Sequence, residues 1–325
     1  MLPYIIRRLA ISVVVLLVST FMVFYLVAKS GNPLSTLATR QPPPPRSTIL
    51  ALRHQLHLDS SIPVRYWYWL RDAVQGNFGH DLGGASVTSE LSSRLGVTTR
   101  LIFAAVVLAL ILALVTGVLS AVKQYSVMDY ASTFVSFLLI SIPTFWFAGV
   151  LKDIGIRINQ GAGSRIFSVS GEVTPDYHGG FFGGLSDRLS HLILPTISLA
   201  MLTYAVWSRY LRATMLDVLN ADYMRLARAK GVRWGRVLVR HGLRTALIPF
   251  TTVVAVTFSA LVGGTVITET IFDWHGMGEW LVQSLGKTDI NPVLAYLFVT
   301  AIAVVVFNLI ADILYAVLDP RIRLA

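Results

Sequence analysis

LIFAAVVLALILALVTGVLSAV, residues 101–122, contains no Asp, Glu, Lys or Arg. A helix needs about 20 mostly apolar residues to cross a bilayer core about 30 Å thick, and this stretch is long enough. Across the whole chain, hydrophobic residues make up 54% and charged residues only 14%. An average soluble protein has roughly 25% charged residues. The sequence therefore predicts an integral membrane protein.

Six stretches without acidic or basic residues predict an all-α polytopic membrane protein with six transmembrane helices. They are Leu9–Ala28, Leu101–Val122, Tyr130–Leu151, Leu189–Ser208, Thr245–Thr268 and Ile290–Ala311, the last continuing to about Leu318. The first is longer than the 7–15 apolar residues typical of a signal peptide, so we expect an uncleaved helix. Pro143 and Pro195 fall in the third and fourth stretches, where we expect kinks.

The positive charges are distributed as topology signals. The net charge is +10, but the basic residues flank the apolar stretches, which favours contact with lipid headgroups over nucleic-acid binding. With the N-terminus in the cytoplasm, the inside segments 1–8, 123–129, 209–244 and 319–325 carry 14 Lys/Arg in 58 residues. The outside segments 29–100, 152–188 and 269–289 carry 13 in 130. The higher density inside predicts that both termini are cytoplasmic.

These assignments divide the chain into four parts. They are a first transmembrane helix (1–28), a large extracytoplasmic loop (29–100), a core of five transmembrane helices (101–318) and a short cytoplasmic tail (319–325). In the large loop, the aromatic run Tyr66–Trp69 predicts a helix at the outer membrane surface, where such rings concentrate. Pro42–Pro45 predicts a stiff spacer of polyproline II conformation.

The inside segment 209–244 is too long for a simple connection and carries nine Lys/Arg. Asp222 is placed to cap a short helix that Gly231 would end, and a second short helix is expected over Val237–Leu247, before Pro249. Two interpretations remain open on physical grounds. The segment either fixes topology by binding anionic lipid, or it is a docking element for a soluble partner.

The same segment resembles a known family. Tyr223-Met-Arg-Leu-Ala-Arg-Ala-Lys-Gly231 and the following residues to Pro249 resemble the cytoplasmic EAA loop of ABC-importer permeases, in the version of the peptide and nickel permeases. Ala227 and Gly231 would occupy the shared small positions. Arg225 stands where the general motif has Glu, and Pro249 lies further from Gly231 than in that motif. Both departures are usual in the peptide branch.

Further motifs, in order along the chain, resemble the B-type permease subunit of dipeptide, oligopeptide and nickel importers. They are Tyr4–Leu9, Gly31–Pro33, Leu52–Asp59, Pro63–Tyr66, Ser141–Pro143, His191–Pro195, Glu269–Phe272, Gly276–Gly278 and Asp312–Arg323. The resemblance implies a type I ABC importer transmembrane fold in the bacterial cytoplasmic membrane. It implies a peptide importer in which this chain and a second, different permease subunit form the pathway.

The resemblance also implies the other partners. They are two ABC ATPase subunits, an extracytoplasmic substrate-binding protein and membrane lipid. The chain has no GxxxxGK[ST] loop, so ATP and Mg²⁺ are expected in the partners, with no cofactor and no enzyme activity in this chain. The ATPase-coupling residues would be Asp222, Tyr223, Arg225, Ala227, Arg228, Lys230 and Gly231.

Other candidate sites are less specific. Asn308 and Asp312 are four residues apart and share a helix face, and an acid within a span is a functional candidate. With Glu269 they are candidates for the pathway or its gate, although structural roles would also explain them. His54 and His57 have a spacing that suits a shared metal, but no third ligand is nearby, so we assign no metal site. The absence of cysteine excludes thiolate chemistry.

Three alternative functions stay open from the sequence. A nickel-chelate permease would share the same motifs. An ion-coupled secondary transporter usually carries buried ionisable residues, which are nearly absent from these spans. A membrane scaffold would use the basic loop to recruit a soluble protein without transport. Uptake that depends on ATP distinguishes the importer from the other two classes.

Overall fold

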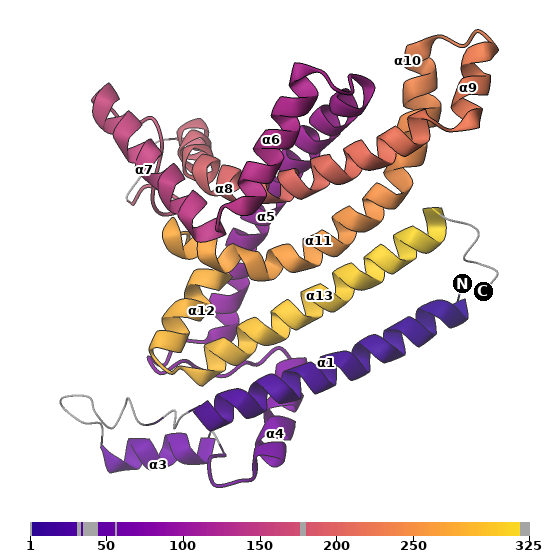
Figure 1. Ribbon diagram of the computed structural model, residues 1–325. Helices are drawn as coiled ribbons and strands as arrows, with labels where there is room; N and C mark the ends of the chain where they lie inside the picture. The colour runs from indigo at the N-terminus through magenta and orange to yellow at the C-terminus, as the bar shows by residue number, and fades with distance from the viewer. Residues whose placement is uncertain (1, 31–33, 35–44, 56, 176–179, 319–325) are drawn as a thin grey trace. The chain divides into compact units, whose positions relative to one another are not determined.

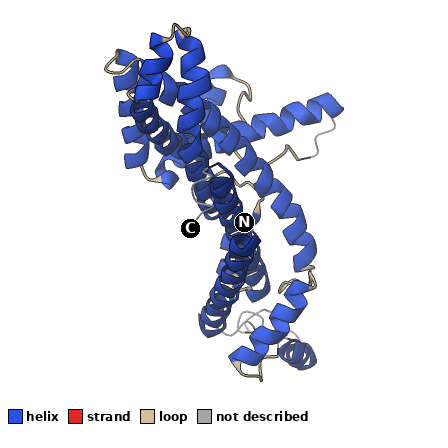
Figure 2. Cartoon of the chain, turned by 90° about the vertical axis from the view of Figure 1, so that its right-hand side faces the viewer, coloured by secondary structure: helices blue, strands red, loops and turns tan. Residues whose placement is uncertain are grey.

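The computed structural model describes residues 2–30, 34, 45–55, 57–175 and 180–318. Its helices are α1 (Leu2–Ser30), α3 (Arg46–Gln55), α4 (Ile62–Val74), α5 (Val87–Val122), α6 (Val127–Ser141), α7 (Thr144–Ala162), α8 (Phe181–Leu219), α9 (Asp222–Ala229), α10 (Trp234–Val237), η1 (Leu238–Leu243), α11 (Arg244–Ile271), α12 (Met277–Gly286) and α13 (Ile290–Leu318). Within the described ranges there is no strand (Figure 2). His80 and Ser86 form an isolated bridge. The all-α class is confirmed.

Four of the expected spans lie within single helices. These are α1, α5, α8 and α13, which are long and apolar enough to cross a membrane. Pro195 lies inside α8, which continues through it. The sixth stretch ends as expected, because α13 continues to Leu318.

The third stretch, Tyr130–Leu151, is broken rather than kinked. Helices α6 and α7 meet at 108° across Ile142 and Pro143. Proline has no amide hydrogen and disfavours helical backbone at the residue before it, and Ile142 is extended, with φ −90° and ψ 130°. The prediction of one continuous span was wrong here, and α6 with α7 forms either a broken span or a re-entrant loop.

The fifth stretch, Thr245–Thr268, lies in α11, whose side chains at 259–260 and 262–264 are not described. The described residues therefore do not establish the count of six spans. The prediction of a short helix ending before Pro249 was wrong. Instead α10, the π-turn η1 and α11 follow one another without a break, and Pro249 lies inside α11.

The chain forms two compact units, and the first comprises Thr99–Trp274 with the end of α13 from Val306. In this unit α8 packs against α6, α7 and α11 (Figure 1). Trp207 of α8 is fully buried, and its indole Nε1 donates to Thr257 Oγ1 of α11 at 3.2 Å. A Cβ on Gly117 of α5 would lie 2.9 Å from the Ser208 carbonyl of α8, so only glycine permits this approach.

The second unit comprises Leu2–Thr98 and His275–Val305. The helix expected around residues 62–70 is confirmed as α4, with Pro63 in its first turn, where proline needs no hydrogen-bond partner. Tyr66 of α4 lies 2.9 Å from Thr20 Oγ1 of α1, and Trp69 packs edge-on against Phe298 of α13. Helix α3 was not predicted, and residues 42–44 of the expected spacer lie outside the described residues.

Candidate functional site

The basic helix α9 protrudes beside α10 at the ends of α8 and α11 (Figure 1). Its N-cap is Ala221, whose backbone is extended, with φ −69° and ψ 146°. The prediction that Asp222 caps the helix was wrong, because Asp222 is the first helical residue and makes no capping bond. Its carboxylate still lies in the first turn, where the helix dipole favours negative charge.

The end of α9 is a Schellman motif built around Gly231. The Gly231 amide donates to the Arg228 carbonyl at 3.0 Å, and the Val232 amide donates to the Ala227 carbonyl at 3.3 Å. Gly231 has φ +72°, in the left-handed region that L-residues with a side chain disfavour. The prediction that Gly231 ends this helix is confirmed.

A single buried methionine anchors α9. Met224 is 1% exposed, while the residues on either side of it are exposed. A Cβ added to Gly242 of η1 would lie 3.2 Å from the Met224 methyl carbon and 3.9 Å from that of Met215 of α8. Met215 is itself fully buried. The absence of a side chain at Gly242 therefore allows α9 to pack closely against η1 and the end of α8.

The opposite surface of α9 is positively charged and partly apolar. Between residues 222 and 244 there are seven Lys/Arg and one acid. Leu226 and Tyr223 are 56% and 43% exposed, and the Arg228 guanidinium lies 4.6 Å from the centre of the Trp234 ring. The exposed Asp222–Arg225 pair, at 4.0 Å, contributes little in water. This surface can bind an acidic, partly apolar partner.

The predicted residues fall into two sets. The seven of the basic loop all lie on α9 and in its C-terminal turn, so the structure brings them together. Glu269 is fully buried in the last turn of α11, and Asn308 is exposed on α13. Asp312 lies one turn beyond Asn308 on α13, and its side chain is outside the described residues.

One ion pair was not foreseen from the sequence. Asp129 at the start of α6 binds Arg212 of α8, two turns before the end of that helix. The available signal was local, because Ser126 and Asp129 have the spacing of a helix N-terminus, and the Ser126 hydroxyl does accept from the Asp129 amide. We had counted Arg212 only as a topology charge.

His54 and His57 do not form a recognisable metal site. The His57 ring stacks on Tyr68, with 4.4 Å between ring centres. No group of three or more potential metal-binding side chains occurs within the part of the chain that the structure describes.

Helices of membrane-spanning length define a multi-pass membrane protein, and its basic loop carries a helix closed by a Schellman motif. Residues 113–324 match the family described as binding-protein-dependent transport system inner membrane component. Residues 1–88 match the N-terminal component of the same systems. The chain therefore belongs to this family of ABC transporter permeases, which are transport subunits and not enzymes.

Named relatives cover essentially the whole chain. The oligopeptide transport system permease protein OppB of Mycobacterium tuberculosis is 41% identical over 322 residues, 99% of each chain. The oligopeptide permease AppB of Bacillus subtilis is 39% identical over 326 residues, 99% of this chain and all of the relative. The glutathione permease GsiC of Escherichia coli is 33% identical over 325 residues, 99% of each chain.

Proposed function

We propose that this chain is the transmembrane subunit of an ATP-driven peptide importer and that α9 with Gly231 couples it to an ATPase. The observation that supports the coupling role is the helix α9 in the basic loop. This helix is closed by the Schellman motif at Gly231 and is anchored through Met224. Its charged surface is left free to bind a partner, which supports docking over a role in topology alone.

The attachment of α9 explains how movement would reach the transmembrane helices. Met224 lies close to Gly242 of η1, and η1 continues directly into α11. Two residues separate α9 from the end of α8. A displacement of α9 by closing ATPase subunits would therefore act on α8 and α11 together, as rigid-body coupling through an interface. ATP and Mg²⁺ would be bound by the partners.

Peptides are the proposed substrate class. The relatives are named for oligopeptides and for glutathione, which is itself a tripeptide derivative. These names favour a peptide importer over a nickel-chelate permease. Selection among peptides would lie largely in an extracytoplasmic binding protein.

The family supports a proposal for the rest of the assembly. The chain would pair with a second, different permease subunit and two ATPase subunits in the inner membrane, with both termini cytoplasmic. That orientation places the basic loop on the side where ATP is available. Glu269, Asn308 and Asp312 are proposed as pathway or gating residues of this chain.

The decisive experiment is purification of the tagged chain from native membranes in mild detergent. Bound proteins would be identified by mass spectrometry, and ATP-dependent uptake of labelled peptides would be measured after reconstitution. We expect two ATPases and a second permease to co-purify and uptake to require ATP. Uptake that needs only an ion gradient would instead indicate a secondary transporter, and stable partners without uptake would indicate a scaffold.

A further inference from the structure

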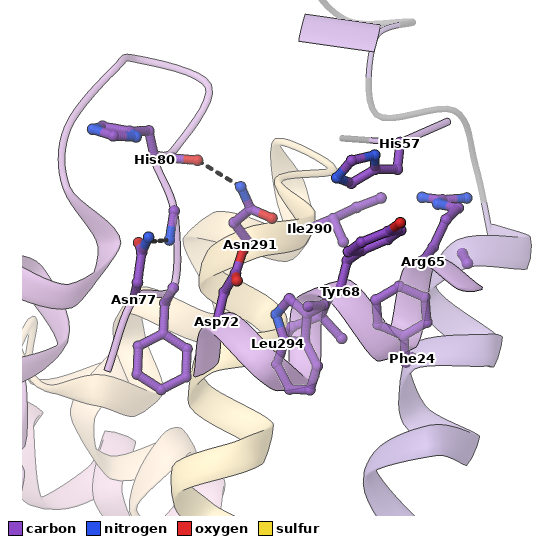
Figure 3. A pocket seen from close by; sticks show the side chains of 14 residues that line it. Phe24, His57, Arg65, Tyr68, Asp72, Asn77, His80, Ile290, Asn291 and Leu294 are labelled. Carbon is purple, nitrogen blue, oxygen red and sulfur yellow. Dashed lines mark hydrogen bonds between the residues drawn. The ribbon is translucent and has the colours of Figure 1, made fainter. Parts of the chain in front are cut away.

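Two cavities of the second unit adjoin each other at Trp69 and Leu294, which line both. The first is about 200 Å³ in volume and lies among α1, α4 and the start of α13 (Figure 3). The second is also about 200 Å³ and lies between α1 and α13. A water molecule takes about 30 Å³ of the liquid, so each cavity is large enough for a group of several heavy atoms.

The first cavity contains buried hydrogen-bond donors without partners. Within the described ranges, Arg65 Nε and Trp69 Nε1 are buried and make no hydrogen bond. The Arg65 guanidinium lies 5.9 Å from the centre of the Phe24 ring, and burial lowers the pKa of Arg65 because its charge has lost water. Buried donors without acceptors are costly. Arg65 lines this cavity and its guanidinium carries further donors, so it fits a ligand with acceptor oxygens.

Three of the other polar residues that line this cavity already make hydrogen bonds. Asp72, the one carboxylate among the described lining residues, accepts two hydrogen bonds from Arg71 at 3.1 Å. The Asn291 amide donates to the His80 carbonyl at 2.8 Å, and Asn77 accepts from a backbone amide (Figure 3). Arg65 is therefore the cation left to bind an anionic group, and a phosphate matches its fork of donors.

The second cavity is apolar and follows two membrane-length helices. Its wall includes Val23 of α1 and Leu297, Phe298 and Ala301 of α13. Both helices qualify as membrane spans by length and hydropathy. A soluble anion would gain no binding free energy from this apolar groove. A hydrocarbon chain beside a bilayer would gain it by burying apolar surface. The adjoining polar and apolar cavities therefore fit an amphipathic ligand.

We propose that these two cavities bind one phospholipid molecule, with its phosphate at Arg65 and one acyl chain in the groove between α1 and α13. The site is separate from the basic loop and does not depend on the importer function. It assigns to this chain a specific lipid in addition to the general lipid that surrounds any membrane protein. A bound lipid would fill the space between α1, α4 and α13 and hold these helices together.

The test is native mass spectrometry of the full-length chain after delipidation in detergent. Phosphatidylethanolamine with palmitoyl and oleoyl chains is added at graded concentrations to the unmodified chain and to four variants. Arg65→Gln removes the phosphate ligand and Ala301→Phe fills the acyl groove, so we expect each to weaken retention of the first lipid at least fivefold. Arg46→Gln makes the same charge change at an exposed residue that lines neither cavity, and we expect less than a twofold change.

The pair of variants separates a phospholipid from a soluble anion. If Arg65→Gln weakens binding while Ala301→Phe does not, or if glycerophosphoethanolamine without acyl chains competes equally well, the ligand is a soluble phosphate compound and the proposal fails. If neither variant has an effect, the retained lipid is nonspecific and the proposal also fails. Ala301→Gly keeps the groove open and should retain the lipid. Unchanged circular dichroism of Arg65→Gln and Ala301→Phe would exclude misfolding as the cause of weaker retention.

Discussion

Asp129 of α6 and Arg212 of α8 form a two-point ion pair. Arg212 Nε donates to Oδ1 at 2.6 Å and its terminal nitrogen donates to Oδ2 at 2.7 Å. Asp129 is 2% exposed and also accepts from the Tyr125 amide at 3.0 Å. Further along the same two helices, the hydroxyls of Ser136 and Ser208 lie 3.1 Å apart. These contacts fasten α6 to the part of α8 that leads into the basic loop.

Replacing Asp129 with Asn should destabilise the chain by about 3 kcal/mol, because Arg212 would keep its buried position and lose its counter-charge. This loss of stability is at the low end of the range for breaking a buried ion pair, because the Arg212 side chain is 27% exposed. The measurement is the free energy of unfolding of the purified chain in a denaturing-detergent titration.

A matched control is Asp153→Asn on α7. Its partner Arg157 is bound at 2.7 Å, but the two side chains are 57% and 75% exposed. Exposed pairs contribute little, so we expect a change within about 0.5 kcal/mol. Equal losses in the two variants would show that burial does not strengthen the Asp129–Arg212 pair.

Gly231→Val should abolish ATP-driven uptake by the assembled importer while the chain still inserts into the membrane. Nothing lies within 4 Å of a Cβ at Gly231, so the effect comes from the backbone. A side chain at φ +72° costs about 1 kcal/mol or more and would re-aim the segment after α9. Uptake into proteoliposomes and membrane fractionation measure the two properties.

Two variants separate backbone strain from bulk. Gly235 of α10 also has open space around its Cβ position but has no positive φ, so Gly235→Val should retain uptake. Asn tolerates the left-handed region better than other residues with a side chain, so Gly231→Asn should keep more uptake than Gly231→Val. Equal loss at both glycines would attribute the effect to side-chain volume.

Met224→Ala should release α9 from the rest of its unit. Truncating a buried methionine costs about 2–5 kcal/mol, and Met224 is the buried side chain of this eight-residue helix. Limited trypsin digestion reports the release, because the loop is rich in Lys and Arg, and we expect cleavage within 222–244 to accelerate at least tenfold. Leu226→Ala on the same helix removes a side chain that is 56% exposed, and its cleavage rate should be close to that of the unmodified chain.

The turn before α13 should loosen as the pH rises. Burial raises the pKa of Asp289 above its ordinary value of 3.8, and nearby Asp81 adds to the effect. A carboxyl with a raised folded-state pKa contributes stability that is complete below the ordinary value and lost as pH rises through the raised one. Asp289 accepts from the Leu82 amide at 2.7 Å, so hydrogen exchange at Leu82, corrected for its intrinsic pH dependence, reports the loss.

Asp289→Asn should remove most of this pH dependence, because Asn can accept the same bond and does not ionise. Asp59→Asn, at a carboxylate exposed in its pair with Arg53, should leave the dependence unchanged. A Leu82 exchange profile that keeps its pH dependence in Asp289→Asn would assign the effect to another group.

The sequence predicted the membrane class and the basic loop because both depend on local patterns. Uncharged runs such as 101–122 require helices in lipid whatever their neighbours are, and Gly231 marks a helix end by its own backbone freedom. Local patterns did not predict that the third stretch is broken into two helices at Pro143. A proline can lie inside a continued helix, as Pro195 does in α8, or stand at a break, as Pro143 does between α6 and α7.

The sequence by itself thus determined the all-helical membrane fold, the family and the helix–glycine unit at 222–231. The tertiary structure decided which charges are paired and which small residues permit close approach. In the sequence, Arg212 is one of nine basic residues of segment 209–244. Only the packing of α6 against α8 places Asp129 within 2.6 Å of it. Gly242 matters because Met224 packs against it, and Arg65 is a candidate ligand because it is half-buried beside Phe24. Such contacts join residues far apart in the chain or on separate elements, and no local spacing rule specifies them.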